Sequence, residues 1–149
     1  MTRRCEVLLV EDDPEDTDLA REAFKKCAPQ VHLSSVEDGV LALAYLRREP
    51  PFNDAARPDL ILLDLNVPRM DGREFLKEIK NDDRLKDVPV LVVTTSDAEN
   101  DILKCYRLGA NCYLTKPVDI GEFFEIIRLI GLFWLSTAKL PSKSGVDGS

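Results

Sequence analysis

The stretch LILLD at residues 60–64 decides the fold: four apolar residues run together and end abruptly at Asp64. The segment LLVED at residues 8–12 repeats the pattern near the N-terminus, where an apolar run ends at Glu11. Short runs that are apolar on both faces are typical of strands in a parallel sheet that is covered on both sides. We therefore expect buried parallel strands at Val7–Val10 and Leu60–Leu63.

Outward from these two strands, short apolar runs alternate with longer segments whose apolar residues recur at helical spacing. Three further strands are expected at Val31–Val36, Val90–Val93 and Cys112–Leu114. The expected helices cover residues 15–27, 38–48, 73–81, 99–108 (with Gly109 as the C-cap) and 119–136. A strand and a helix thus alternate five times. This order predicts a doubly wound α/β fold, with five parallel strands and five helices.

The length and composition favour one acidic, soluble domain. The chain has 149 residues, with 20 Lys and Arg against 27 Asp and Glu, a net charge of −7. This charge argues against nucleic acid as a partner, since phosphate binding needs a basic face. Residues 1–136 are expected to form the domain, and residues 137–149 a polar tail.

Targeting and zinc-binding signals are not expected in this sequence. The N-terminus carries no apolar stretch of signal-peptide length, and residues 123–135 are too short and too charged to span a membrane. Four cysteines without a CxxC pair, and one histidine, do not form a zinc motif. We expect a cytoplasmic protein with reduced cysteines and no membrane contact.

Four of the five expected strands are followed by polar residues that could act together in a single reaction. Glu11 and Asp12 follow the first strand, Asp64 the third, Thr94 the fourth and Lys116 the fifth. Each residue alone has a simple alternative, because acids often cap a helix or open a turn. In doubly wound sheets, however, the functional site lies outside the carboxyl ends of the strands. The sequence therefore predicts that these five side chains meet.

Together these residues fit magnesium-dependent phosphoryl transfer. Carboxylates that crowd at a dry edge repel one another, and a hard divalent cation removes that cost. Asp12 and Asp64 are the expected direct Mg²⁺ ligands, with Glu11 acting through water and one backbone carbonyl completing the protein ligands. A carboxylate can also attack phosphorus, and Lys116 and Thr94 would then neutralise the phosphoryl oxygens.

Four motifs in this order resemble the receiver domain of bacterial two-component response regulators. They are LLVEDD at 8–13, ILLDLNVPRMDG at 61–72, VTTS at 93–96 and GANCYLTKP at 109–117. The resemblance covers about residues 5–136 and implies a CheY-like fold with strand order 2-1-3-4-5. It also implies a cis peptide bond at Pro117.

The resemblance assigns roles to individual residues. It implies that Asp64 is the phosphoryl acceptor and that the Asn66 backbone carbonyl joins Glu11, Asp12 and Asp64 around the metal. Thr94 and Lys116 would move onto the phosphoryl group, and Tyr113 matches the aromatic switch position. The first acid of the family's pair is often aspartate, and Glu11 is a common variant that keeps the metal role.

A narrower resemblance points to the single-domain regulators that partner bacterial phytochromes. It rests on the loop at residues 49–58, on NCYLTKP at 111–117 and on FWLSTAKLP at 133–141. It implies a sensor histidine kinase as partner, with a phytochrome as that kinase. The residues after 136 are too few for a DNA-binding module, so the expected output is a protein–protein contact or phosphorelay to another histidine.

Three other functions are alternatives to a signalling switch. A flavodoxin-like cofactor binder needs a Ser/Thr/Gly-rich phosphate cradle after the first strand, where this chain has EDDP. A phosphohydrolase that forms an aspartyl phosphate typically has a second acid two residues after the nucleophile, where this chain has Asn66. An inactive scaffold would not need the chemical positions filled. We therefore expect a signalling switch rather than an enzyme acting on an external substrate.

The last expected helix has more apolar residues than one buried stripe requires. A single stripe is formed by Phe123, Ile126, Ile127, Ile130 and Trp134. Phe124, Leu132, Phe133 and Leu135 point partly to other faces, and an exposed apolar patch commonly marks an interface. We therefore predict a homodimer with Phe133 and Trp134 in its interface. The alternative is that these extra side chains fold back onto the domain.

Overall fold

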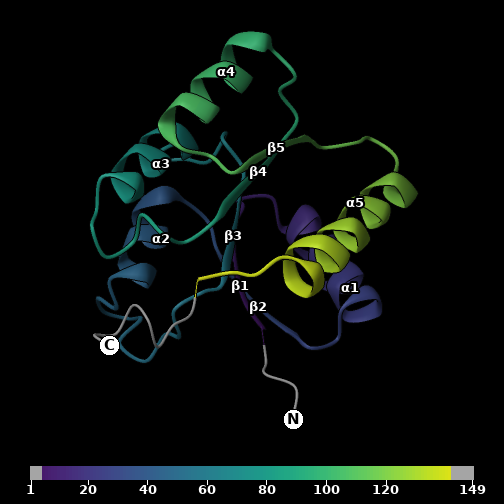
Figure 1. Ribbon diagram of the computed structural model, residues 1–149, viewed down its shortest axis with the longest axis horizontal. Coiled ribbons are helices and arrows are strands. Elements are labelled where there is room, and N and C mark those ends of the chain that lie inside the picture. Colours follow the sequence, from purple (N-terminus) through teal and green to yellow (C-terminus); the bar gives the residue numbers. More distant parts are fainter. Residues whose placement is uncertain (1–4, 142–149) are drawn as a thin grey trace.

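The computed structural model describes residues 5–141 and forms an α/β sandwich (Figure 1). Its five strands are β1 (Cys5–Val10), β2 (Val31–Val36), β3 (Leu60–Leu63), β4 (Val90–Thr94) and β5 (Cys112–Thr115). All pairings are parallel, in the order β2-β1-β3-β4-β5. The predicted fold class and strand order are confirmed, with β2 and β5 at the edges.

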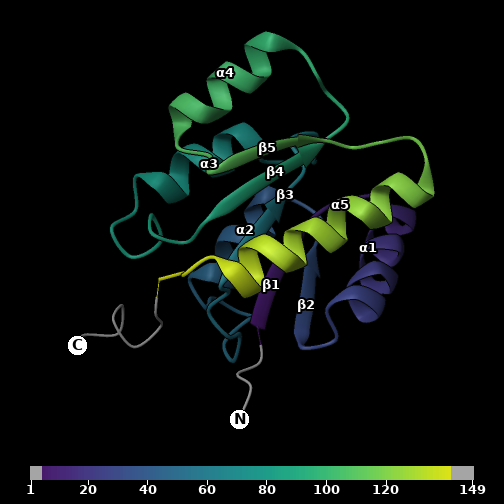
Figure 2. The same cartoon turned by 45° about the vertical axis from the view of Figure 1, so that its right-hand side comes forward.

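Helices cover both faces of the sheet, as the apolar strands require. They are α1 (Pro14–Cys27), α2 (Gly39–Leu46), α3 (Gly72–Lys80), α4 (Glu99–Leu108) and α5 (Ile120–Leu132). One face packs on α1 and α5, which lie side by side, and the other face on α2, α3 and α4 (Figures 1 and 2). Every residue of β3 is fully buried between these two layers.

Aspartates begin most of the helices. The side chains of Asp13, Asp38, Asp71 and Asp119 accept hydrogen bonds from the first-turn N–H groups of α1, α2, α3 and α5. The simple capping alternative is therefore correct for Asp13 in the EDDP segment. It does not extend to Glu11 and Asp12, which precede the cap. The helix α4 ends at Gly109, whose φ of 108° only glycine adopts readily.

The C-terminal helix changes geometry near its end. After α5, residues Phe133–Thr137 form a wider π-helical turn, named η1. The hydroxyls of Ser136 and Thr137 donate to the carbonyls of Gly131 and Leu132, which supports this turn. The predicted helical extent to about residue 136 is close to the observed one. Of the predicted polar tail, residues 142–149 lie outside the described residues.

The prediction of a cis peptide at Pro117 is wrong. Within residues 5–141 the cis peptide joins Pro50 to Pro51, in the loop between α2 and β3. The trans isomer is the more stable one for most peptide bonds that precede proline, and the bond between Lys116 and Pro117 is trans here.

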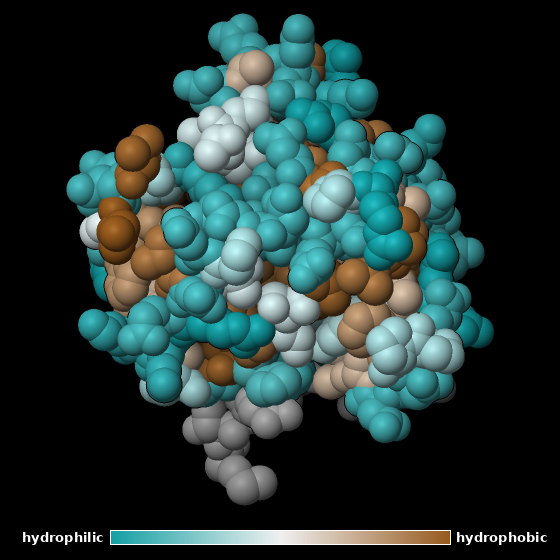
Figure 3. All heavy atoms as spheres, turned by 180° about the vertical axis from the view of Figure 1, so that it is seen from behind, coloured by the Kyte–Doolittle hydropathy of each residue, from teal (hydrophilic) through white to brown (hydrophobic). Residues whose placement is uncertain are grey.

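The face opposite to the one in Figure 1 is mostly hydrophilic (Figure 3). The face opposite to Figure 1 carries scattered apolar side chains among polar ones (Figure 3). In residues 5–141, no helix has the length and apolar character needed to cross a membrane.

Candidate functional site

The strand order brings the predicted site residues together. β1, β3, β4 and β5 are consecutive neighbours in the sheet, and all run in the same direction. Their carboxyl ends therefore share one edge, where Glu11, Asp64, Thr94 and Lys116 make direct contacts. Asp12 lies next to Glu11 at this edge and is exposed to solvent.

The Asp64 carboxylate is held from two sides. Its Oδ1 accepts hydrogen bonds from the Thr94 hydroxyl at 3.0 Å and from the Asn66 backbone N–H at 3.0 Å. Its Oδ2 accepts from Lys116 Nζ at 3.1 Å. The side chain is only 10% exposed, so these donors replace most of its hydration. The geometry fixes the orientation of a carboxylate whose Oδ2 has one described protein donor.

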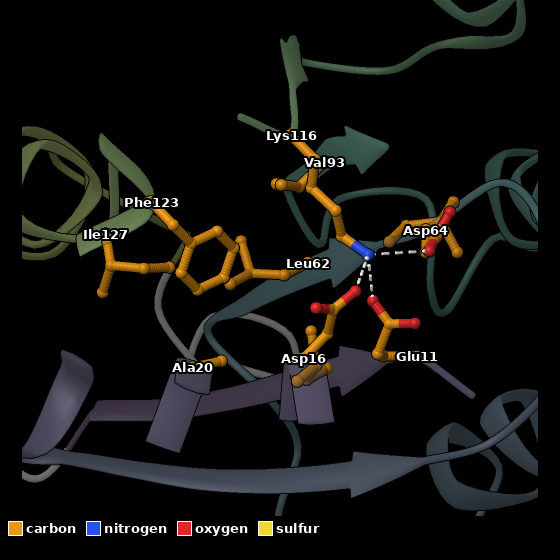
Figure 4. Close-up of a pocket in the computed structure, with 11 residues that line it drawn as sticks. Glu11, Asp16, Ala20, Leu62, Asp64, Val93, Lys116, Phe123 and Ile127 are labelled. Atoms are coloured by element: carbon orange, nitrogen blue, oxygen red, sulfur yellow. Dashed lines mark hydrogen bonds and ion pairs between the residues drawn. The ribbon is translucent and has the colours of Figure 1, made fainter. Parts of the chain in front are cut away.

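Lys116 forms the centre of the acidic cluster. Its ammonium group donates to Glu11, to Asp16 at 2.8 Å and to Asp64 at 3.1 Å (Figure 4). Burial acts to lower the pKa of Lys116, but the hydrogen bonds to Asp16 and Glu11 and the charge of Asp64 outweigh it and raise that pKa. Lys116 is therefore a permanent cation beside Asp64.

Glu11 is the most buried acid of the site. Burial raises its pKa to about 7, although the hydrogen bond and the charge of Lys116 act in the opposite direction. One of its oxygens binds Lys116, and the other accepts from the backbone N–H of Asp13. Glu11 thus needs a positive partner in order to carry its charge.

Three acids of the site fit a hard divalent cation. Glu11, Asp12 and Asp64 each offer one carboxylate oxygen, and these oxygens lie within 4.8 Å of one another. Oxygen-only donors match the preference of Mg²⁺ and similar ions, and a dication offsets their mutual repulsion. The backbone N–H of Asn66 binds Asp64, and the role of its carbonyl stays a prediction.

Tyr113 lies on β5 and connects to the loop that follows Thr94. Its hydroxyl donates to the backbone carbonyl of Ser96 at 2.8 Å, and its backbone N–H donates to the hydroxyl of Tyr106. Burial raises the pKa of Tyr113, so its phenol stays a donor at neutral pH. The position suits the switch role that the resemblance implies.

An ion pair extends this connection to α3 and α4. The Ser96 hydroxyl donates to Asp101 Oδ2 at 2.6 Å, and the Arg73 guanidinium donates to Asp101 Oδ1 at 2.8 Å. The two hydrogen bonds lower the pKa of Asp101, the one from Ser96 more than the one from Arg73. The loop that carries Ser96 is thereby tied to two helices.

The sequence analysis did not find Asp16 or the pair of Arg73 and Asp101. Asp16 follows the capped start of α1, and its place in the first helical turn above the strand ends was an available signal. The contact of Arg73 with Asp101 joins two helices that are separated by β4. No local sequence pattern marks such a contact.

The two predicted interface residues lie in η1, directly after the C-terminal end of α5. Phe133 is 55% exposed, whereas Trp134 is half-buried against the α1–α5 core layer. Their rings meet edge to face with centroids 5.6 Å apart. Beside them a shallow apolar groove runs between β5 and α5, lined by Cys112, Leu114, Ile126, Leu129, Ile130, Phe133 and Trp134.

Comparison with known proteins defines the class. Residues 7–128 match the response regulator receiver domain, so the chain belongs to this family. It is a signalling switch of a two-component system, with the fold and site geometry described above.

The more specific similarity is to phytochrome response regulators. The chain is 43% identical to response regulator Rcp1 of Synechocystis sp., covering 91% of this chain and 92% of that protein. It is 48% identical to the phosphorylated cyanobacterial phytochrome response regulator RcpA, with a TM-score of 0.90 and coverage of 95% and 100% of the two chains. The Mn²⁺-bound form of Rcp1 matches with a TM-score of 0.87 over 93% of this chain and 99% of that one.

Proposed function

We propose that this protein accepts a phosphoryl group on Asp64 from the histidine of a sensor kinase. The observation that carries the proposal is the Asp64 carboxylate, which is held at the sheet edge between Thr94, Lys116 and the acidic cluster. In this step a carboxylate oxygen attacks phosphorus, the phosphorus–nitrogen bond of the donor breaks, and the imidazole leaves. Of the two oxygens, Oδ2 is the better candidate, since its one described protein donor is Lys116.

Magnesium is the proposed cofactor. Glu11, Asp12 and Asp64 would hold it together with the Asn66 carbonyl, and Mg²⁺ would neutralise the charge on the phosphoryl oxygens. The Mn²⁺-bound form of Rcp1 supports a divalent cation in a similar protein. Lys116 and Thr94 would stabilise the other phosphoryl oxygens.

The proposed output follows from differential binding. Lys116 and Thr94 meet a dianion only after phosphorylation, so they stabilise that state more than the free one. Movement of Thr94 would shift the loop that carries Ser96, and the hydroxyl of Tyr113 would lose or change its acceptor. The signal would then pass by a protein–protein contact or by phosphorelay.

A phytochrome is the proposed kinase, and a homodimer the proposed assembly. The kinase proposal is supported by similarity to the phytochrome response regulators RcpA and Rcp1. The dimer proposal is supported by the exposed side chains of Leu129 and Phe133, which line the groove beside the edge strand β5. We propose a cytoplasmic protein whose partners include neither nucleic acid nor membrane.

Labelling with a small phosphoryl donor tests the acceptor. Incubation with acetyl phosphate and Mg²⁺ should add one phosphoryl group to the intact protein, as measured by mass spectrometry. The variant Asp64→Asn and chelation of the metal should each abolish the addition. The matched control is Asp97→Asn, an exposed aspartate in the β4–α4 loop, which should be labelled like the wild type. Equal labelling of Asp64→Asn and the wild type would refute the assignment.

A further inference from the structure

We propose that Asp16 is a positioning residue for Lys116: its side-chain oxygen accepts a hydrogen bond that holds the ammonium group toward Asp64, and this contact lies outside the metal-binding acids. This inference rests on the proposed role of Asp64 as phosphoryl acceptor. Asp16 belongs to none of the four motifs that the sequence analysis used.

The hydrogen bonds of Lys116 are saturated. An ammonium group has three donors, and here three carboxylates accept them. Figure 4 shows the nitrogen between the carboxylates of Glu11, which follows β1, Asp16, which lies in α1, and Asp64, which follows β3. Lys116 is 9% exposed, so these acids replace nearly all of its hydration.

The three carboxylates differ in what else they can bind. Glu11 and Asp64 belong to the set of acids whose oxygens converge within 4.8 Å, and Asp16 does not. A dication in that set would withdraw charge from Glu11 and Asp64 and would repel the ammonium group. The hydrogen bond to Asp16 would then be the contact of Lys116 that the metal leaves intact.

The backbone at Asp16 is well suited to this role. Asp16 lies in the first turn of α1, and the Asp13 side chain caps that turn by accepting from the backbone N–H of Glu15. A helix N-terminus favours an ionised carboxylate. Two turns of α1 later, Ala23 and Phe24 are buried in the core, which fixes the helix on the sheet. Asp16 thus offers Lys116 an acceptor on a rigid element.

Glu15 provides a matched comparison. It lies in the same first turn, carries the same charge and is equally able to stabilise the helix N-terminus. Its side chain is exposed, and its described contact is the backbone hydrogen bond to Asp13. A purely helix-stabilising role for Asp16 would therefore give Glu15→Ala and Asp16→Ala the same effects.

The proposal predicts different effects for the two variants. Asp16→Ala should slow phosphorylation by acetyl phosphate at saturating Mg²⁺ by about fivefold, the size expected for one partly exposed, charge-assisted hydrogen bond. Asp16→Asn keeps an acceptor oxygen at the same place and should restore at least half of the rate. Glu15→Ala should be phosphorylated at the wild-type rate.

A spectroscopic readout tests the contact without phosphorylation. The ¹⁵N-edited NMR signal of the Lys116 ammonium group, measured with Mg²⁺, should be visible in the wild type, Asp16→Asn and Glu15→Ala. It should be lost in Asp16→Ala, because a freed ammonium group exchanges its protons rapidly with water. The signal is assigned by its absence in Lys116→Met.

The two readouts separate the inference from the proposed function. A wild-type rate and an unchanged ammonium signal in Asp16→Ala would overturn the positioning role while leaving Asp64 as acceptor. An Asp16→Asn variant as slow as Asp16→Ala would also overturn it. If the wild type took up no phosphoryl group, the proposed function would fail, and the ammonium signal would still report whether Asp16 holds Lys116.

Discussion

The sheet edge around Asp64 and the groove between β5 and α5 depart from ordinary protein surfaces in opposite ways. At the edge, Lys116 and Asp64 are only 9% and 10% exposed although both are charged. In the groove region, Leu129 and Phe133 are 50% and 55% exposed although both are apolar. Buried charges and exposed apolar groups are each unfavourable unless something offsets them.

The two regions differ in what offsets the buried charges and the exposed apolar side chains. At the edge, the acids and Lys116 neutralise one another inside the same chain. Around the groove, the described residues do not cover Leu129 or Phe133. The edge therefore suits the proposed chemistry within the protein, and the exposed apolar side chains of the groove support the proposed contact with a second copy. Substitutions in one region at a time test this difference.

The largest effect on stability should follow Lys116→Met. Removing one partner of a buried ion pair leaves uncompensated charge, and the loss should be about 3 kcal/mol in the free energy of unfolding. Mg²⁺ should recover part of this loss, because a dication also neutralises Glu11 and Asp64. Urea unfolding with EDTA and with Mg²⁺ measures both effects. Lys77→Met, at an exposed position of α3, is the control. Wild-type stability of Lys116→Met in EDTA would contradict the account.

Charges placed in the groove should dissociate the proposed dimer. The pair Leu129→Glu and Phe133→Lys should give the mass of one chain by light scattering at concentrations where the wild type has twice that mass. Burial of two such side chains contributes about 3–5 kcal/mol before association costs. Trp134 is a poorer target than the sequence suggested, because it packs on the core.

The control for the dimer is Val40→Lys, an exposed apolar residue on α2. It should keep the wild-type mass. A wild-type mass of one chain across micromolar concentrations would refute the dimer, and a dimer that survives the double substitution would place the interface elsewhere.

A smaller loss of stability, about 1–2 kcal/mol, should follow Thr94→Val, which removes one buried hydrogen bond to Asp64. The variant should still take up the phosphoryl group on Asp64. The NMR signals of Tyr113 should change on phosphorylation in the wild type and stay near their free positions in the variant. If they change as in the wild type, the Thr94 hydroxyl does not couple the site to Tyr113.

The smallest effect on stability should follow Asp101→Asn. This substitution removes the negative charge from the partly exposed ion pair between Asp101 and Arg73. The folded-state pKa of Asp101 is lowered, so this carboxylate contributes stability above its unfolded pKa and loses it as the pH falls through the folded pKa. The thermal midpoint of the variant should be slightly lower at pH 7 and equal to the wild type at pH 2. An equal difference at both pH values would contradict this origin.

The sequence predicted the fold because its local and global signals agree. The apolar runs of β1, β3 and β4 end at Glu11, Asp64 and Thr94, so one pattern marks both the strands and the site. Residue spacing then placed the side chains correctly at one edge. The roles of Tyr113 and Asn66 came from resemblance and stay predictions.

The remaining contacts depend on how helices are placed on the sheet. Asp16 reaches Lys116 because α1 begins at the sheet edge where β5 ends, and the contact spans 100 residues of sequence. The π-helical turn at Phe133–Thr137 and the half-burial of Trp134 depend on packing against the core. Single-residue patterns carry no information about such distances.

The most direct test is to locate the phosphoryl group after transfer from a purified phytochrome histidine kinase. Borohydride reduces an acyl phosphate to an alcohol and thereby converts a phosphorylated aspartate to homoserine, which peptide mass spectrometry detects. The account predicts homoserine at position 64, in a sample that contained Mg²⁺ and not in one that contained EDTA. Homoserine at Asp12 or at another aspartate, or a phosphorylated protein with unmodified Asp64, would contradict it.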